Sequence, residues 1–151
     1  MFRLVRNFLL LACVFQLSGC AIDVSSSSFL HQDASASGLD TTALSQAVNK
    51  DEAAMTITTV EIVNGEELTL KGVAVAYPDP IVNVVLFADN GMTISKNSAL
   101  LHEFGKLPAN VLWVDYQGTG ASDKAKRARM YNLKRDSLLV YDYAKEVFAN
   151  D

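Results

Sequence analysis

Cysteine is scarce in this sequence, which holds two in 151 residues, Cys13 and Cys20. Cys13 lies in an apolar N-terminal run that is typical of an export leader, so the processed chain would keep Cys20 alone and could form no internal disulfide. The same apolar run, from Phe8 to Phe15, is far shorter than the roughly 20 residues of a membrane-spanning helix. The sequence therefore excludes both a disulfide-stabilised scaffold and an N-terminal spanning helix.

The glycine motifs of nucleotide-binding proteins are also missing. No GxxxxGK[ST] run is present, and Gly118 and Gly120 stand without the third glycine and the immediate helix of a dinucleotide fingerprint. An excess of basic residues is absent too, since the formal net charge is −4. We therefore expect no cofactor and no nucleic-acid partner.

The N-terminus instead carries the parts of a lipoprotein leader. Arg3 and Arg6 form a basic segment, the apolar run follows, and the sequence LSGC ends at Cys20. This tetrapeptide resembles the lipobox of bacterial lipoproteins, in which cleavage occurs before the cysteine and the cysteine is diacylated. The resemblance implies a signal peptide over residues 1–19, lipidation of Cys20 and a place in the bacterial envelope, with Ala21 favouring the outer over the inner membrane. An ordinary secretory signal with a chance cysteine is the alternative.

Residues 20–54 are rich in Ser, Ala, Thr and Asp and show no extended apolar periodicity. This composition predicts a lipidated, flexible tether ahead of the rest of the chain. Leu44 and Val48 are four residues apart, as on one helix face, but we expect two apolar positions to be too few to hold a helix. The folded part is expected over residues 55–151, which is enough for one small domain.

A β-hairpin is predicted directly after the tether. Residues 55–63 are dominated by alternating β-branched side chains, Asn64-Gly65 follows, and residues 68–77 form the return strand. An Asn-Gly pair between such runs is the strongest short hairpin signal. Two further strands are predicted over 81–88 and 111–116 because both are mostly apolar, and the first suits a strand that is covered on both faces.

Helical periodicity appears twice in the same part of the chain. Ser95 is expected to cap a helix that Pro108 stops, with an apolar face made of Leu100, Leu101, Phe104 and Leu107. A second helix is predicted from a stripe made of Leu133, Ser137, Val140, Tyr141, Ala144, Val147 and Phe148. The element order is then three strands, a helix, a strand and a helix. A hairpin that feeds a βαβ unit predicts the α/β class, with a mixed sheet whose parallel part is packed by helices.

Three segments of this part together resemble a known family. VVLFADNGMTIS, NVLWVDYQGTGASD and NLKRDSLLVYDYA are similar to the N-terminal portion of α/β hydrolases, close to the lipoprotein and acyl-hydrolase branch, and the resemblance spans about residues 66–148. It implies a partial α/β-hydrolase-like sheet in which the loop after the third strand supplies one backbone N–H of an oxyanion hole, at Asn90. It also implies that the loop with Gly118 and Gly120 is a turn at the active-site rim, where glycine permits torsions that side chains forbid.

The chain departs from the family's pattern at three places. Ala88-Asp89 stands where the family has His-Gly or Gly-Gly, which puts a carboxylate beside the oxyanion position. Gln117 replaces an arginine and so removes a charged partner for nearby carboxylates such as Asp115. Where family members tend to have Ser and Glu before the last helix, this chain has the basic residues Lys124, Lys126, Arg127 and Arg129. Cations are unfavourable at a helix N-terminus. We therefore expect this cluster either to form a solvated loop or to contact the anionic lipid headgroups of the membrane.

The catalytic triad of the family has no counterpart in this chain. No G-x-S-x-G motif is present, and His102 falls in the first predicted helix, where we expect a surface histidine and not a base. The chain reaches Asp151 where the nucleophile strand of the family would begin. We therefore expect a hydrolase-like protein that is truncated before its nucleophile, has no catalytic residue and is inactive alone. The strand 81–88 would then be a bare sheet edge that needs a strand-completing protein partner.

Two other functions stay open at this point. A small envelope lipoprotein could use the half sheet in a binding or structural role, with the edge 81–88 accepting a partner strand by β-augmentation. An enzyme of another type could use Asp89, Asp115 and Asp123 as metal ligands, but without motif spacing these residues are more simply caps and turn residues, so we predict no metal site. The motifs favour the first function, a membrane-anchored lipoprotein of the serine ester or acyl hydrolase class.

Overall fold

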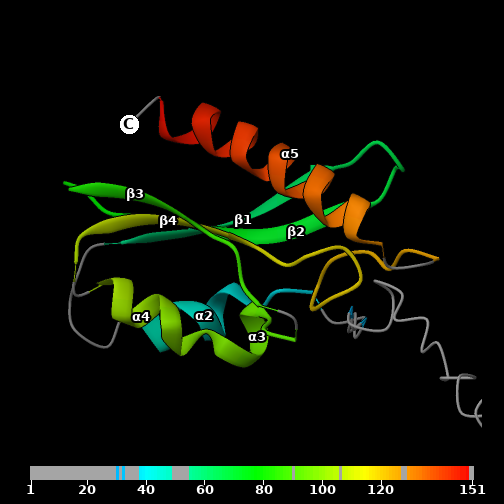
Figure 1. Cartoon of the computed structure of the whole chain (residues 1–151). Coiled ribbons are helices and arrows are strands. Elements are labelled where there is room, and N and C mark those ends of the chain that lie inside the picture. The colour runs from blue at the N-terminus through cyan, green and yellow to red at the C-terminus, as the bar shows by residue number, and fades with distance from the viewer. Residues whose placement is uncertain are drawn as a thin grey trace, which may run out of the picture.

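A mixed four-stranded sheet is the centre of the structure, a computed structural model of the chain. Figure 1 shows the sheet between two layers of helices. This arrangement belongs to the α/β class, as the element order predicts. The structure describes residues 30, 32, 38–48, 55–89, 91–105, 107–126 and 129–149.

The predicted hairpin is confirmed, but its turn is longer than an Asn-Gly pair. Strand β1 (Thr56–Val63) runs antiparallel to β2 (Thr69–Ala76). The Asn64 side-chain oxygen accepts hydrogen bonds from two backbone N–H groups, those of Glu66 and Leu68, at 2.9 and 3.2 Å. The left-handed residue of the turn is Glu67, with φ of 59°, and not the glycine. A short polar side chain at the start of a turn is well suited to bond the backbone that follows it.

The strands lie in the order β1-β2-β4-β3. Strand β4 (Ala109–Val114) is buried along its whole length and pairs antiparallel with β2 and parallel with β3 (Val82–Leu86). Among the described strands, β3 pairs with β4 alone, so it is the edge strand that we expected from the segment 81–88. Its flanking residues Ile81 and Phe87 are exposed.

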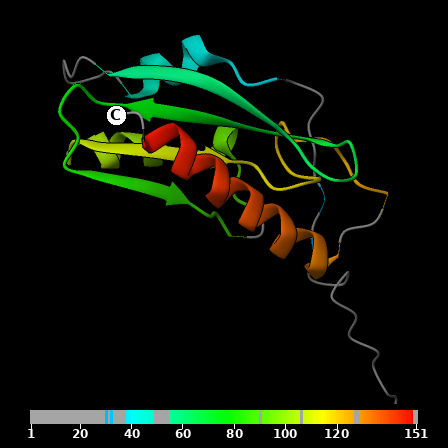
Figure 2. The ribbon, with the colours of Figure 1, turned by 90° about the horizontal axis from the view of Figure 1, so that it is seen from above.

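Helices cover both faces of the sheet. Helix α5 (Met130–Phe148) lies on one face, and α2 (Thr41–Val48), α3 (Ile94–Asn97) and α4 (Ala99–Gly105) lie on the other (Figure 1). Figure 2 shows α5 running diagonally over the sheet. None of the helices in the described ranges is long and apolar enough to span a bilayer.

Strand β4 supplies the core on both faces of the sheet. Because successive side chains of a strand point to opposite faces, Val111 and Trp113 join the cluster under α2 to α4. Leu112 and Val114 join the cluster under α5. The central position of β4 therefore explains why its sequence is almost continuously apolar.

Helix α2 corrects one expectation about the tether. Leu44 was expected to be too weakly supported to hold a helix, yet it is 4% exposed and belongs to the core beneath the sheet. The Asp40 carboxylate caps the helix by accepting hydrogen bonds from the N–H groups of Thr42 and Ala43, both at 3.0 Å. Tertiary packing and a cap thus replace the missing apolar periodicity. Apart from residues 30, 32 and 38–48, the segment 1–54 lies outside the described residues.

The helix expected from Ser95 to Leu107 is divided in two. Helices α3 and α4 are separated at Ser98, and Thr93 stands at the N-cap in place of Ser95. Leu107 follows α4 and is 58% exposed, so it does not belong to the apolar face as we expected. The segment is still amphipathic, because Ile94 and Leu101 are fully buried against the sheet.

Helix α5 buries the predicted apolar stripe in part, since Val140 and Ala144 are buried and Phe148 packs against the same cluster. The buried residues recur every fourth position and include two polar ones; they are Asn132, Asp136, Val140 and Ala144. Tyr141, which we placed in the stripe, is 52% exposed, and the Lys145 ammonium lies 5.1 Å from its ring centroid. Of the two buried polar residues, Asp136 accepts hydrogen bonds from the Asn64 amide of the hairpin turn.

Candidate functional site

A buried carboxylate connects the two loops that follow the parallel strands. Asp115, directly after β4, is 1% exposed. Its Oδ1 accepts a hydrogen bond of 2.9 Å from the N–H of Ile94, the first residue of α3, and its Oδ2 accepts one of 3.0 Å from the N–H of Ala121. One side chain therefore fixes the start of α3 against the glycine loop. A carboxylate at a helix N-terminus is also favoured by the helix dipole.

The glycine loop adopts the torsions that we expected of it. Gly118 and Gly120 have φ of 83° and 52°, in the left-handed region that favours glycine. A Cβ atom on Gly120 would overlap the Asp115 carboxylate. Glycine at position 120 therefore permits the left-handed backbone conformation and also leaves space for the buried Asp115 carboxylate.

The end of the glycine loop is bound to β2. The Ser122 hydroxyl donates to the Asp115 carbonyl at 2.6 Å and accepts from the Lys71 N–H at 2.8 Å. The Asp123 carboxylate accepts from the Thr69 N–H at 2.8 Å. Asp115 and Asp123 thus bind backbone donors, as caps and turn residues do.

The metal alternative gains no support from these contacts. Asp89, the third carboxylate of that alternative, is exposed in the loop after β3. Within the described ranges, no group of three or more His, Cys, Asp or Glu side chains could hold a metal ion.

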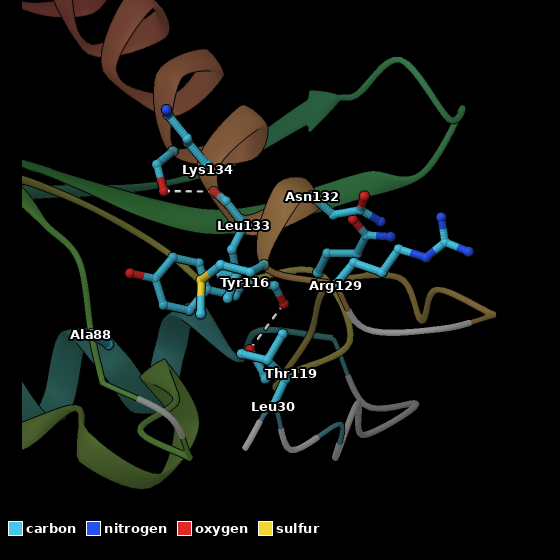
Figure 3. A pocket seen from close by; sticks show the side chains of 11 residues that line it. Leu30, Ala88, Tyr116, Thr119, Arg129, Asn132, Leu133 and Lys134 are labelled. Carbon is cyan, nitrogen blue, oxygen red and sulfur yellow. Dashed lines mark hydrogen bonds between the residues drawn. The ribbon is translucent and has the colours of Figure 1, made fainter. Parts of the chain in front are cut away.

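An apolar cavity of about 350 Å³ lies at the carboxyl ends of β3 and β4, next to the start of α5 (Figure 3). In open α/β sheets, ligands bind outside the carboxyl ends of the strands. The residues that line this apolar cavity are Leu30, Ala88, Tyr116, Gln117, Thr119, Arg129, Met130, Asn132, Leu133, Lys134 and Ser137. The apolar cavity is therefore the candidate functional site of the described part of the chain.

The serine and threonine hydroxyl groups of the apolar cavity are hydrogen-bonded to the backbone. Thr119 donates its hydroxyl hydrogen to the Tyr116 carbonyl at 2.9 Å, and Ser137 donates to the Leu133 carbonyl at 2.7 Å. No His, Asp, Glu or Cys is among the described residues that line the cavity. Neither hydroxyl therefore has a histidine or carboxylate in the described lining that could activate it as a nucleophile.

Burial raises the pKa of the Tyr116 hydroxyl above its ordinary value of 10.0. This group therefore stays protonated at neutral pH and can act only as a neutral donor or acceptor.

A second hollow adjoins the apolar cavity and has a different chemical character. This cationic hollow, of about 440 Å³, is lined by Glu66, Leu68, Lys124, Ala125, Lys126, Arg129 and Asn132. Arg129 and Asn132 line both hollows. Three members of the basic cluster before the last helix, Lys124, Lys126 and Arg129, are exposed to solvent and line this concave surface.

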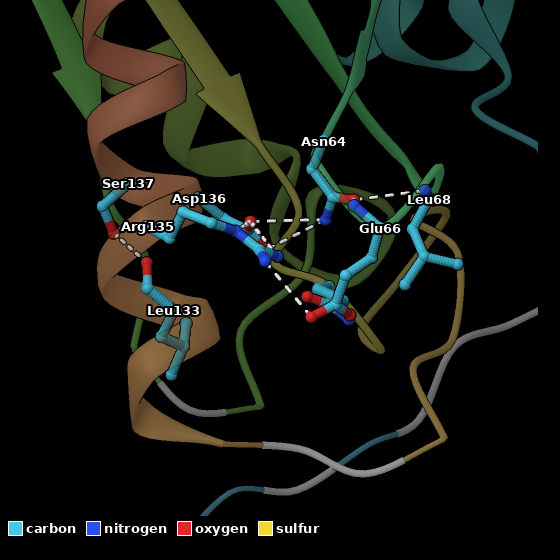
Figure 4. Close-up of polar contacts among 8 residues, drawn as sticks. Asn64, Glu66, Leu68, Leu133, Arg135, Asp136 and Ser137 are labelled. Atoms are coloured by element: carbon cyan, nitrogen blue, oxygen red, sulfur yellow. Dashed lines mark hydrogen bonds and ion pairs between the residues drawn. The ribbon is translucent and has the colours of Figure 1, made fainter.

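A buried polar network joins the hairpin turn to α5 (Figure 4). The Asn64 amide donates to both Asp136 oxygens, at 3.3 and 3.4 Å. Arg135 donates to Asp136 at 3.0 Å and to Glu66 at 3.2 Å, so it pairs with two carboxylates. Burial raises the pKa of Asp136 above its ordinary value of 3.8, although the adjacent Arg135 opposes that shift.

The structure locates only some of the residues that the sequence singled out. Asn90 and Cys20 lie outside the described residues, so the oxyanion donor and the lipid anchor stay predictions. His102 is in α4 and does not line the apolar cavity. The Gln117 amide donates to Glu66 at 3.4 Å, so the site where the family has arginine faces this carboxylate and not Asp115.

The sequence analysis missed Asn132 and Asp136 as buried residues. Their four-residue spacing with Val140 and Ala144 was the available signal. Polar residues in such a row are normally assigned to solvent, because isolated polar side chains are costly to bury. Asp136 has one partner next to it in sequence, Arg135, and a second, Asn64, that only the position of the hairpin turn provides.

Comparison with protein-family models, with curated proteins and with solved structures found no match to this chain. The class of the protein is therefore defined by its own geometry. It is an α/β protein whose mixed four-stranded sheet has an apolar cavity at the carboxyl ends of its two parallel strands.

We predict that Gly120→Ala lowers the free energy of unfolding by about 2–4 kcal/mol, because backbone strain and the displaced Asp115 carboxylate add. Urea unfolding followed by the fluorescence of Trp113, the single tryptophan, measures this change. Gly91→Ala is the matched control for strain alone, since Gly91 has φ of 99° and open space around it. Gly65→Ala, with neither constraint, should be nearly neutral. Equal losses at Gly120 and Gly91 would show that the Asp115 contact is unimportant.

We also predict that Asp136 makes stability depend on pH. Because its folded pKa is raised, the folded chain holds this proton more tightly than the unfolded chain. The resulting stability is complete below pH 3.8 and is lost as the pH rises through the folded pKa. Asp136→Asn should flatten this decline in urea unfolding across a pH series, whereas the exposed Asp142→Asn on the same helix should not. Parallel profiles for Asp136→Asn and the wild type would disprove the assignment.

Proposed function

We propose that this chain is the N-terminal part of a lipid-anchored α/β-hydrolase-like protein, of the serine ester or acyl hydrolase class, and that it has no hydrolytic activity alone. The strand order β1-β2-β4-β3 is the observation that carries this proposal. The resemblance requires the third strand to lie beside the fourth and to leave its other side for a nucleophile strand. Strand β3 has that arrangement, since β4 is its one partner among the described strands.

The connection between the two loops supports the same proposal. The resemblance assigns an oxyanion donor to the loop after β3 and a rim turn to the loop after β4. Asp115 bonds the N–H of Ile94, and the glycines of the rim turn have the torsions that the turn requires. A single oxyanion donor gives about 10²–10³ in rate only where a nucleophile is present to use it.

The absence of a usable nucleophile supports the inactive state. The sequence has no G-x-S-x-G motif, and the serine and threonine that line the apolar cavity donate to backbone carbonyls. In the described lining no histidine is present to act as a base. A serine hydrolase needs all of these parts within hydrogen-bond reach of one another.

The packing of helices on both faces of the sheet favours a second function. Both faces of the sheet have a hydrophobic cluster, and the edge strand β3 is available for β-augmentation. These features support an envelope lipoprotein with a binding or structural role. A monomeric chain with a single cooperative unfolding transition would favour this function over the partial hydrolase, because a sheet cut beside β3 should unfold without strong cooperativity.

The hydrolytic part of the proposal is tested with a fluorophosphonate probe and a p-nitrophenyl ester. We expect no labelling and no turnover above the uncatalysed rate. Ser137→Ala and Thr119→Ala serve as controls for the two hydroxyls in the apolar cavity. Labelling of the wild type that is lost in either variant would contradict the proposal.

The anchor is tested by substitution of each cysteine. Two or three acyl chains on Cys20 would hold the protein firmly, since each buried methylene contributes about 0.8 kcal/mol. In cells grown with labelled palmitate, Cys20→Ser should abolish incorporation of the label into the protein. Cys13→Ser is the matched control and should keep the label, because Cys13 precedes the expected cleavage site. Label that persists in Cys20→Ser would exclude the lipobox.

A further inference from the structure

The apolar cavity and the cationic hollow are two parts of one continuous surface. They share Arg129 and Asn132, and they lie on either side of the start of α5. Apart from Arg129 and Lys134, the apolar cavity presents uncharged side chains such as Met130 and Leu133. A ligand that occupied both hollows would therefore need an apolar part and a polar head.

The charge around the two hollows is positive, although the whole chain has a formal net charge of −4. Four cations line them, and none forms an ion pair with another described residue; they are Lys124, Lys126, Arg129 and Lys134. The one carboxylate in the lining, that of Glu66, is paired with Arg135. A concave surface of one sign raises the local concentration of the opposite charge.

Asn132 is the observation that indicates a ligand. This residue is 8% exposed, and its side-chain amide has no hydrogen-bond partner among the described residues. The amide lines both hollows, so its N–H groups and its oxygen are free to bind a ligand there. In Figure 3 the Asn132 and Arg129 side chains extend to the side of the cavity that is remote from Ala88.

Two further groups at the same place lack partners. The Gln117 Oε1 atom is buried without a hydrogen bond. At the start of α5, the N-cap residue Arg129 makes no side-chain cap, and the first turn contains no acidic residue. The positive end of the helix dipole is therefore available to an anion.

We propose that the two hollows together bind a single-chain anionic amphiphile. The acyl chain occupies the apolar cavity, whose volume of about 350 Å³ is within the roughly 300–1,000 Å³ of small-molecule sites. The carboxylate or phosphate head binds Arg129, the Asn132 amide and the N-terminus of α5. This inference does not depend on the hydrolase resemblance, because it uses only the cavity, its charge and its unpartnered amide.

The test measures binding to the full chain in phosphatidylcholine nanodiscs, with empty nanodiscs as the baseline. Laurate, dodecyl phosphate and uncharged monolaurin are the three probes. We expect both anions to bind at least tenfold more tightly than monolaurin. Each methylene added between octanoate and laurate should tighten Kd by about fourfold. Tighter binding of laurate would indicate a free fatty acid as the natural ligand, and tighter binding of dodecyl phosphate would indicate a phosphate-bearing lipid.

Two variants test the assigned contacts. Arg129→Gln should weaken laurate binding by roughly 10- to 100-fold without changing monolaurin binding, and Lys145→Gln, on the same helix but outside both hollows, should change neither. Asn132→Leu should weaken binding of both anions while leaving the thermal midpoint unchanged or higher, because the amide has no structural partner to lose.

Three results would overturn the proposal. Equal binding of laurate and monolaurin would show that the head is not recognised. Independence from chain length would show that the apolar cavity is not used. A lower thermal midpoint in Asn132→Leu with unchanged laurate binding would assign the amide to the fold and not to a ligand.

Discussion

The carboxylate of Asp115 is the contact on which the site depends. It bonds the N–H of Ile94 and the N–H of Ala121, and so holds together the two loops that leave the parallel strands. The contact requires glycine at position 120, where any side chain would overlap the acid. Because Asp115 is buried, these hydrogen bonds form in a medium of low dielectric constant, where they are stronger than in water. The bonds of Ser122 and Asp123 to β2 hold the other end of the same loop.

The sheet determines where these loops lie. Strands β3 and β4 are parallel neighbours, so β3 ends and the glycine loop begins on the same side of the sheet, next to the start of α5. The polar network of Asn64, Asp136 and Arg135 then fixes α5 against the hairpin turn. A buried carboxylate is tolerated there because a cation and an amide satisfy it. The cationic hollow forms between the hairpin turn, the loop residues 124–126 and the start of α5.

Much of the fold could be predicted from periodicity and turn residues. The hairpin, both later strands and the last helix follow from local patterns, and the edge position of β3 follows from the resemblance. Helix α2 could not be predicted, because Leu44 has too few apolar neighbours in sequence and finds its partners across the sheet. Asn132 and Asp136 were missed for the same kind of reason. Their burial depends on contacts with segments that are distant in sequence.

The sequence alone determined the class of fold, the glycine torsions after β4 and the absence of a G-x-S-x-G nucleophile, because each depends on residues that are close together in the chain. It also showed the basic cluster before α5, but not that this cluster lines a hollow. Only the tertiary structure brought Lys124, Lys126 and Arg129 beside an apolar cavity and an unpartnered amide. Such a site depends on how a helix start, a loop and a strand end are arranged in space, and packing between remote segments sets that arrangement.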